Sequence, residues 1–301
     1  MSVTVKELQG AFSVAFTTFN EDGSVDYDQY KKQLEYLCRA GSDGIVMYGM
    51  TSEYHKLTDA EKEKLTAIFL ETLRGSEVIS VLSVTDWSTD IAVKTAGKYE
   101  SMGADALMLM PPFYFKPQLE GVRDHMIQVL ETVSIPVILQ YAPLATGHYM
   151  EERELVDMSV KYPNAAYKIE YRPAVEFLAK FFALKPDLPV LTGWAGLEII
   201  DLYRIGVRGV ITVGGFPELY AAIFRSLRGG KIEEARALYD ALHPYISGWM
   251  NTPETLLAIE KEILRRRGII RSSYCRKPTY SLTEENSKEI DRFLAEFGSY
   301  F

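Results

Sequence analysis

The chain alternates short apolar runs with amphipathic helical segments, and this alternation restricts its fold more than any other feature. Eight runs rich in apolar and β-branched residues recur at Ala11–Phe16, Gly44–Tyr48, Val78–Val84, Ala104–Met110, Ile135–Gln140, Ala165–Ile169, Pro189–Thr192 and Gly209–Val213. The clearest helical segments between them are Asp26–Leu37, Asp59–Leu73, Thr89–Glu100, Leu119–Thr132, Glu151–Lys161 and Ala174–Leu184. Strands that alternate with helices form parallel sheets with right-handed crossovers, so eight such units predict a closed (β/α)₈ barrel of the α/β class.

An open doubly wound sheet is the alternative architecture. Such a sheet normally carries a glycine-rich phosphate turn after its first strand, and the segment Phe16–Phe19 is not one. The strands are apolar almost throughout, which is typical of parallel strands that are buried on both faces. We therefore favour the barrel.

The chain continues beyond the eighth unit without a linker-like break. Three further helices are expected at Ile232–Leu242, Pro253–Arg267 and Thr283–Phe297. The predicted organisation is a catalytic barrel over residues 1–228 and a helical extension over residues 229–301 that packs on the barrel.

Composition excludes several classes of function. The 301 residues are 47% hydrophobic and 25% charged, as in ordinary globular proteins, and the net charge of −8 disfavours nucleic acid and anionic membranes as partners. Cys38 and Cys275 have no metal-binding or redox spacing, which suits a reducing compartment. The first ten residues lack the apolar run of a signal peptide, and no stretch is long enough to span a bilayer. We expect a cytoplasmic protein that uses no metal.

Lys168 is the strongest candidate for chemistry. It stands at the end of the sixth predicted strand, and active sites of such barrels lie at the carboxyl ends of the strands. An isolated ammonium among apolar strands is costly, so such a lysine tends to shed its proton and act as a nucleophile. The alternative is a surface lysine at a strand end.

Glu170 is the second candidate, because it follows Lys168 by two residues. Alternate residues of a strand share a face, so both side chains should point the same way. A carboxylate beside the nucleophile can serve as a general acid and base. The alternative is a structural glutamate paired with a neighbour such as Arg172.

Several motifs occur as an ordered set at the predicted strand ends. They are Asn20–Asp26 after the first strand, the Gly49-x-Thr-x-Glu53 turn after the second, Pro112–Pro117 after the fourth, the strand of Lys168, and Gly209–Thr212 in the eighth. The set resembles the dihydrodipicolinate synthase/N-acetylneuraminate lyase family, the Schiff-base class I aldolases on a TIM barrel. The resemblance extends from about Gly10 to the end of the chain.

The resemblance implies a mechanism and an assembly. Lys168 would form an imine with the 2-keto group of a small-molecule substrate, without any cofactor. The turn of Thr51 and Ser52 would grip the substrate carboxylate, with help from the positive end of a helix that starts there. Gly193 and Ile211 would line the site through their backbone. Tyr114 matches a relay tyrosine that neighbouring subunits exchange across a dimer interface, which implies a homotetramer of tight dimers.

Other positions depart from the family's synthases. Gln140 occupies the place of their strand-five proton-relay tyrosine, and Tyr141 follows one residue later, where it should face the opposite side of the strand. Met50 replaces the relay threonine, and Ala145 replaces an arginine that binds a second carboxylate. A one-residue bulge would be needed to bring Tyr141 into the site.

These departures favour dehydration of a 2-keto-3-deoxy sugar acid. A dehydratase needs a group that removes a proton from C3 and then protonates the leaving hydroxyl, and Glu170 can do both, whereas Gln140 cannot titrate. The segments around Gln140 and Lys168 are similar to those of the family's 2-keto-3-deoxy-pentonate (arabonate) dehydratases. The alternatives are a pyruvate-dependent aldolase of the sugar-acid or N-acetylneuraminate type, a deaminase, a dihydrodipicolinate synthase, or a catalytically impaired regulatory or ligand-binding barrel.

Overall fold

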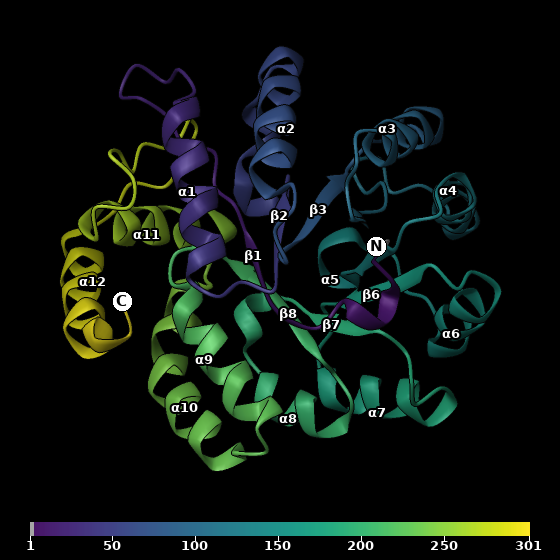
Figure 1. Ribbon diagram of the computed structural model, residues 1–301. Coiled ribbons are helices and arrows are strands. Elements are labelled where there is room, and N and C mark those ends of the chain that lie inside the picture. Colours follow the sequence, from purple (N-terminus) through teal and green to yellow (C-terminus); the bar gives the residue numbers. More distant parts are fainter. Residues whose placement is uncertain (1–2) are drawn as a thin grey trace. The chain divides into compact units, whose positions relative to one another are not determined.

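The predicted barrel is confirmed. The structure is a computed structural model that describes residues 3–301, and its eight parallel strands close into a barrel in the order of the sequence (Figure 1). The strands are β1 Gly10–Val14, β2 Gly44–Met47, β3 Ile79–Val84, β4 Ala106–Leu109, β5 Val137–Tyr141, β6 Ala165–Ile169, β7 Val190–Thr192 and β8 Gly209–Val213. Each predicted strand is present: the bounds of β6 and β8 are as predicted, and those of the others differ by one or two residues at one or both ends.

Helices connect the strands and continue after the last one. The α-helices are α1 Tyr27–Arg39, α2 Asp59–Leu73, α3 Thr89–Ser101, α4 Leu119–Thr132, α5 Pro143–Thr146, α6 Glu152–Lys161, α7 Ala174–Leu184, α8 Ile199–Ile205, α9 Pro217–Arg228, α10 Ile232–Trp249, α11 Pro253–Arg266 and α12 Glu284–Phe297. Short 3₁₀ turns lie at η1 Val5–Glu7, η2 Met50–Ser52, η3 Tyr54–Lys56, η4 Trp194–Gly196 and η5 Gly298–Tyr300. Within residues 3–301, no helix combines the length and the apolar character needed to cross a membrane.

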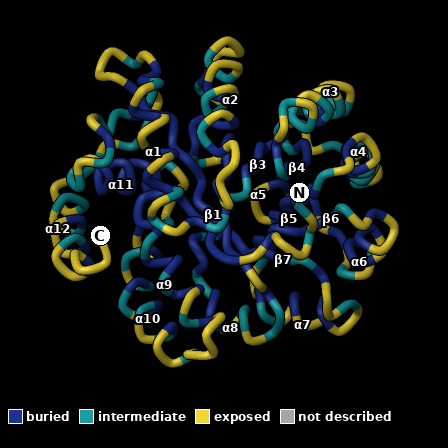
Figure 2. Tube along the Cα trace, viewed as in Figure 1, coloured by how far each residue is buried: buried dark blue, intermediate teal, exposed yellow. Residues whose placement is uncertain are grey.

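Contacts divide the described chain into two compact units. The first comprises the residues up to Gly10 together with Ile79–Ile211, and the second comprises Ala11–Val78 and Thr212–Phe301. Strand residues are buried almost throughout both units (Figure 2). This burial on both faces explains why the sequences of the strands are continuous apolar runs.

In the first unit, the strands pair in a register that aligns their carboxyl ends. Gln140 of β5 lies directly opposite Lys168 of β6, and Tyr141 lies opposite Ile169. Because side chains alternate along a strand, Gln140 and Lys168 belong to one face of the sheet and Tyr141 to the other. The pairing therefore decides which polar residues can meet.

In the second unit, local signals in the sequence account for where the helices begin. Thr58 caps α2 with a capping box, in which Thr58 and Glu61 satisfy each other's backbone N–H groups. The Asp26 side chain accepts the N–H of Gln29 at the start of α1, with a distance of 3.1 Å. Only α10 runs clearly longer than predicted, because it continues through Pro244, where a missing N–H ordinarily ends a helix.

Helix α11 is the buried helix of the second unit. Every residue from Thr255 to Leu264 is buried, including three charged ones in succession, Glu260, Lys261 and Glu262. Buried charges persist in proteins only when they are paired or hydrogen-bonded. Their partners in the second unit are described below.

Candidate functional site

Lys168 and Glu170 meet at the carboxyl end of β6. The Lys168 Nζ lies 3.3 Å from the Glu170 Oε1, and each side chain is only 9% exposed. The chain reaches this arrangement because the two residues have the same parity at the end of one strand. An amine and a carboxylate in a nearly water-free position can exchange a proton directly, which is the arrangement needed for nucleophilic and acid–base chemistry.

Two further donors hold the Glu170 carboxylate. The Gln140 Nε2 donates to Oε2 over 2.6 Å, and the backbone N–H of Trp194 donates to Oε1 with a nitrogen–oxygen distance of 3.3 Å. A buried carboxylate is stable only when such donors replace its lost hydration. The carboxylate is therefore fixed from β5, from β6 and from the loop after β7.

Gly193 leaves the space that Glu170 fills. A Cβ atom built on Gly193 would lie 1.9 Å from the Glu170 Oε1, which is far inside van der Waals contact. Any side chain at this position would therefore displace the carboxylate. This steric need for glycine was not visible in the sequence.

The loop after Gly193 carries backbone strain. Trp194 and Ala195 both adopt left-handed conformations, with φ of 50° and 51°, and neither is a glycine. This conformation costs about 1–2 kcal/mol per non-glycine residue and tends to persist where function requires it. The Arg172 guanidinium stacks on the Trp194 ring, 4.3 Å from its centroid.

A small pocket opens beside Glu170. Its walls come from the end of β6, from β7 with its following loop, and from the starts of α7 and α8; among its lining residues are Ile169, Glu170, Thr192, Gly193, Trp194 and Leu202. Lys168 is not among the lining residues, so the pocket borders the carboxylate alone.

Tyr141 lies on the other face of its strand. Its hydroxyl donates to the carbonyl of Met150 over 3.0 Å and accepts the N–H of Met150 over 3.1 Å. Its ring stacks on Tyr171 and Phe177, and burial raises its pKa to about 12. The structure contains no bulge that would turn Tyr141, since its ladder pairing with Ile169 is regular within the described strands.

Tyr114 belongs to an exposed aromatic cluster in the loop after β4. It is 73% exposed, its ring contacts Trp87 and Phe115, and Trp87 also contacts Phe113 edge-on. Exposed apolar patches occur at protein, membrane and ligand contacts. The remaining predicted residue of the first unit, Ile211, is buried in β8.

In the second unit, the predicted carboxylate-binding turn is a single 3₁₀ turn, Met50–Ser52. The helix expected to start there is this three-residue turn, and the first α-helix after it, α2, begins only at Asp59. The Ser52 hydroxyl donates back to the carbonyl of Gly49 over 2.7 Å, and the Thr17 hydroxyl donates to the carbonyl of Ser52 over 2.7 Å. Met50 is 40% exposed and Thr51 is partly exposed.

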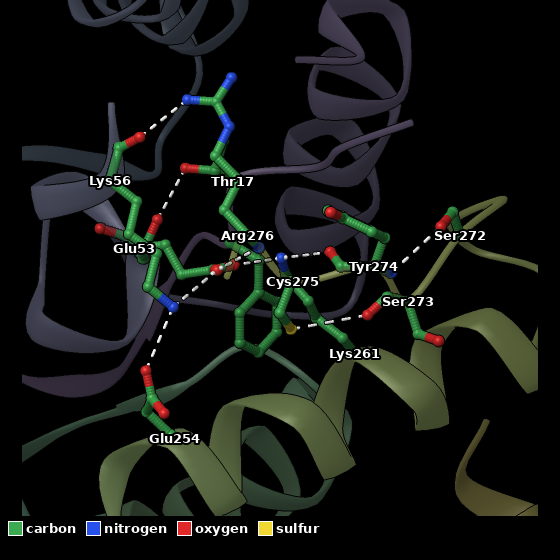
Figure 3. Close-up of polar contacts among 12 residues, drawn as sticks. Thr17, Glu53, Lys56, Glu254, Lys261, Ser272, Ser273, Tyr274, Cys275 and Arg276 are labelled. Carbon is green, nitrogen blue, oxygen red and sulfur yellow. Dashed lines mark hydrogen bonds and ion pairs between the residues drawn. The ribbon is translucent and has the colours of Figure 1, made fainter. Parts of the chain in front are cut away.

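A buried ionic cluster holds Glu53, the residue that ends this turn (Figure 3). The Lys261 Nζ of α11 lies 2.5 Å from Oε2, while the Lys56 Nζ and the backbone N–H of Arg276 reach Oε1 over 3.3 Å and 3.0 Å. The Arg276 guanidinium in turn pairs with Glu61. Losing one partner of such a buried pair leaves an uncompensated charge and is strongly destabilising, so the turn depends on the whole cluster.

Sequence reasoning missed this cluster and the buried acid next to it. Burial raises the pKa of Glu260 to about 8, although the N–H of Gly215 donates to its carboxyl over 2.7 Å. The available signal was a run of three charges, Glu260–Glu262, inside an apolar helix. Glu262 pairs with Arg265 and Arg266 one turn further along the same helix, a spacing that the sequence shows. The partners of Glu260 and Lys261 are Gly215 and Glu53, far away in the sequence, and nothing local identifies them.

Comparisons with known proteins agree with the fold and with the predicted resemblance. Residues 7–297 match the model of the dihydrodipicolinate synthetase family. The chain is 29% identical over 289 residues to an L-2-keto-3-deoxyarabonate dehydratase of Azospirillum brasilense, covering 94% of this chain and 92% of that protein.

Two further relatives are synthases. The chain is 27% identical to a 4-hydroxy-tetrahydrodipicolinate synthase of Chlorobium luteolum, covering 98% of this chain and 99% of the relative. The crystal structure of dihydrodipicolinate synthase from Rhodopseudomonas palustris superposes with a TM-score of 0.87 at 25% identity, over 98% of this chain and 99% of that one. Because the family model covers nearly the whole chain, the protein belongs to the dihydrodipicolinate synthetase family.

Proposed function

We propose that this protein is an imine-forming lyase that dehydrates a 2-keto-3-deoxy sugar acid of the pentonate type. The observation that carries the proposal is the buried pair of Lys168 and Glu170, 3.3 Å apart at the carboxyl end of a barrel strand. The pair joins a nucleophilic amine to an acid–base group on the same face, and the relative from Azospirillum brasilense is named as a dehydratase of this class.

The first half of the proposed reaction makes an enamine. The Lys168 amine adds to the C2 carbonyl, whose oxygen leaves as water, so that a protonated imine forms. The Glu170 carboxylate then accepts a proton from C3. The electron pair of that carbon–hydrogen bond moves into a C2–C3 double bond, while the pair of the imine double bond moves onto nitrogen.

The second half eliminates water. Glu170 returns its proton to the C4 hydroxyl, which leaves as water while the enamine electrons form a C3–C4 double bond and restore the imine. Hydrolysis of the imine frees Lys168, and the pentonate product tautomerises to a semialdehyde. One residue thus performs both proton transfers, and Gln140 contributes by fixing that residue.

The remaining predicted residues have supporting roles in this proposal. Thr51 binds the substrate carboxylate with its hydroxyl and backbone. Ser52 shapes the turn, because its hydroxyl and N–H already donate to Gly49. Met50, Gly193 and Ile211 line the site, while Tyr141 takes no proton because Met150 occupies its hydroxyl.

A product screen tests the proposal. Purified protein is incubated with a panel of 2-keto-3-deoxy pentonates and hexonates, and the products are identified by mass spectrometry. A semialdehyde without pyruvate supports the dehydratase. Release of pyruvate would make the protein an aldolase, and turnover of no keto acid would favour a regulatory barrel.

Condensation of pyruvate with aspartate semialdehyde should be negligible, although several relatives are named as synthases. Gln140 cannot titrate, and Ala145 offers no charge for a second carboxylate. We expect a rate at least about 10²-fold below the dehydration rate, the scale of a missing acid–base group. A coupled assay for the condensation product measures this, and efficient condensation would overturn the proposed specificity.

A homotetramer is expected in solution, with the aromatic cluster of Tyr114 in an interface. Sedimentation velocity should show one species of about four chains at micromolar concentration. Phe115→Glu, at a site that is 88% exposed, should give smaller species because it places a charge in the covered surface. Val160→Glu, at another exposed apolar residue, is the matched control. A wild-type monomer, or equal behaviour of both variants, would contradict this assembly.

A further inference from the structure

The loop that follows β7 has a conformation that its residues do not favour by themselves. Trp194 and Ala195 are left-handed in succession, although neither is a glycine. A strained segment of this kind points to a contact that only this conformation makes. Besides the backbone bonds within the turn itself, the loop donates the Trp194 N–H to the Oε1 of Glu170.

The loop and Glu170 fit each other closely. Gly193 leaves the room that the carboxylate occupies, since a Cβ atom there would lie 1.9 Å from Oε1. The next residue, Trp194, supplies the donor for the same oxygen, which is also the one nearest the Lys168 Nζ. The loop thus sets where the reactive oxygen of Glu170 stands relative to Lys168.

Arg172 joins the loop to the segment that carries Glu170. Its guanidinium lies over the Trp194 ring, 4.3 Å from the centroid. A planar guanidinium stacks on an aromatic face through both cation–π attraction and dispersion, which a lysine ammonium does not reproduce. Arg172 follows Glu170 by two residues. The stack therefore connects the segment that carries the carboxylate with the loop whose N–H binds it.

We propose that Trp194 and Arg172 are positioning residues of the reaction: their stack holds the strained loop so that the Trp194 N–H and the space at Gly193 fix Glu170 for proton transfer at C3. The proposal rests on the proposed function, because it assumes that Glu170 removes this proton. Neither side chain is required to touch the substrate.

The partial reaction that tests the proposal is exchange of the methyl hydrogens of pyruvate with deuterium from solvent, followed by proton NMR. Exchange requires imine formation and then proton transfer at C3, whereas borohydride trapping of pyruvate requires only the imine. A positioning defect should therefore slow exchange and leave the trapped fraction at saturating pyruvate unchanged.

Two variants remove the stack. Trp194→Ala removes the ring while alanine, like tryptophan, disfavours the left-handed conformation, so the loop should relax and exchange should fall about 10-fold or more. Arg172→Met removes the guanidinium and should slow exchange about threefold or more. Trp194→Phe keeps an aromatic face, so its exchange rate should stay within about twofold of the wild-type rate. If the fold required the indole itself, this variant would lose exchange as well.

The matched control is Arg208→Met. Arg208 stacks on Tyr203 at 5.0 Å in the same unit, away from the carboxylate's contacts described above, so its loss should leave exchange unchanged.

Gly193→Ala tests the position of Glu170 in a second way. The added methyl displaces Glu170 directly, and exchange should fall about 10²-fold while trapping persists.

The outcomes separate this inference from the proposed function. If wild-type protein is neither trapped nor active in exchange, the proposed function fails. If wild type does both, and Trp194→Ala and Arg172→Met exchange at the rate of Arg208→Met, the positioning role is overturned. Slower exchange with unchanged trapping, restored in Trp194→Phe, supports it.

Discussion

Lys168→Arg should abolish turnover, with a loss on the order of 10⁴-fold or more, the scale observed when a covalent nucleophile is removed. Arginine keeps the positive charge and much of the length of lysine. Its guanidinium remains protonated at every accessible pH and has no free electron pair to attack a carbonyl. The variant therefore separates the role of Lys168 as a nucleophile from the role of its positive charge.

Mass spectrometry gives the direct measurement. Borohydride with pyruvate should add the mass of the reduced ligand to the peptide that contains Lys168, and the label should be absent from Lys168→Arg. The variant should still melt cooperatively, since its charge can keep the ion pair with Glu170.

Lys180→Arg is the control for this substitution. Lys180 forms an exposed pair with Glu152 at 3.7 Å, so the change should leave turnover and labelling at the wild-type level. A label on a different lysine, or an active enzyme without any label, would refute the imine at Lys168.

Glu170→Gln should lower turnover by about 10²-fold or more while the trapped imine survives. Glutamine keeps the size of the side chain and can still accept the N–H of Trp194, but it cannot carry a proton. The second oxygen becomes an NH₂ group, so Gln140 must turn its own amide over and accept with its oxygen to keep this contact.

Three measurements are compared on the same preparation: turnover of the dehydrated sugar acid, deuterium exchange into pyruvate, and borohydride labelling. The first two should fall together and the third should remain. Glu152→Gln, in the surface pair with Lys180, is the matched control and should change none of the three.

Near-normal turnover in Glu170→Gln would make Glu170 a structural residue. The dehydratase proposal would then lose its main support, and the proton would have to travel through another group, with Tyr114 as the remaining candidate. Loss of labelling together with turnover would instead mean that Glu170 is needed to form the imine.

Much of the architecture was predictable because its determinants are local. Alternating apolar runs and helical periods specify eight strand–helix units, and the carboxyl ends of parallel strands are where a barrel carries its site. Parity along β6 placed Lys168 and Glu170 on one face, and parity along β5 placed Tyr141 on the other, as the structure has them.

Sequence by itself therefore determined the barrel, the strand ends and the lysine–glutamate pair. Only the tertiary structure decided how these parts are held: Glu170 fills the space at Gly193, Trp194 is forced into a left-handed conformation, and Lys261 pairs with Glu53. The physical reason is the distance along the sequence over which each interaction acts. Periodicity and capping act over a few residues, whereas these contacts join segments up to 208 residues apart, where only the path of the folded chain selects the partner.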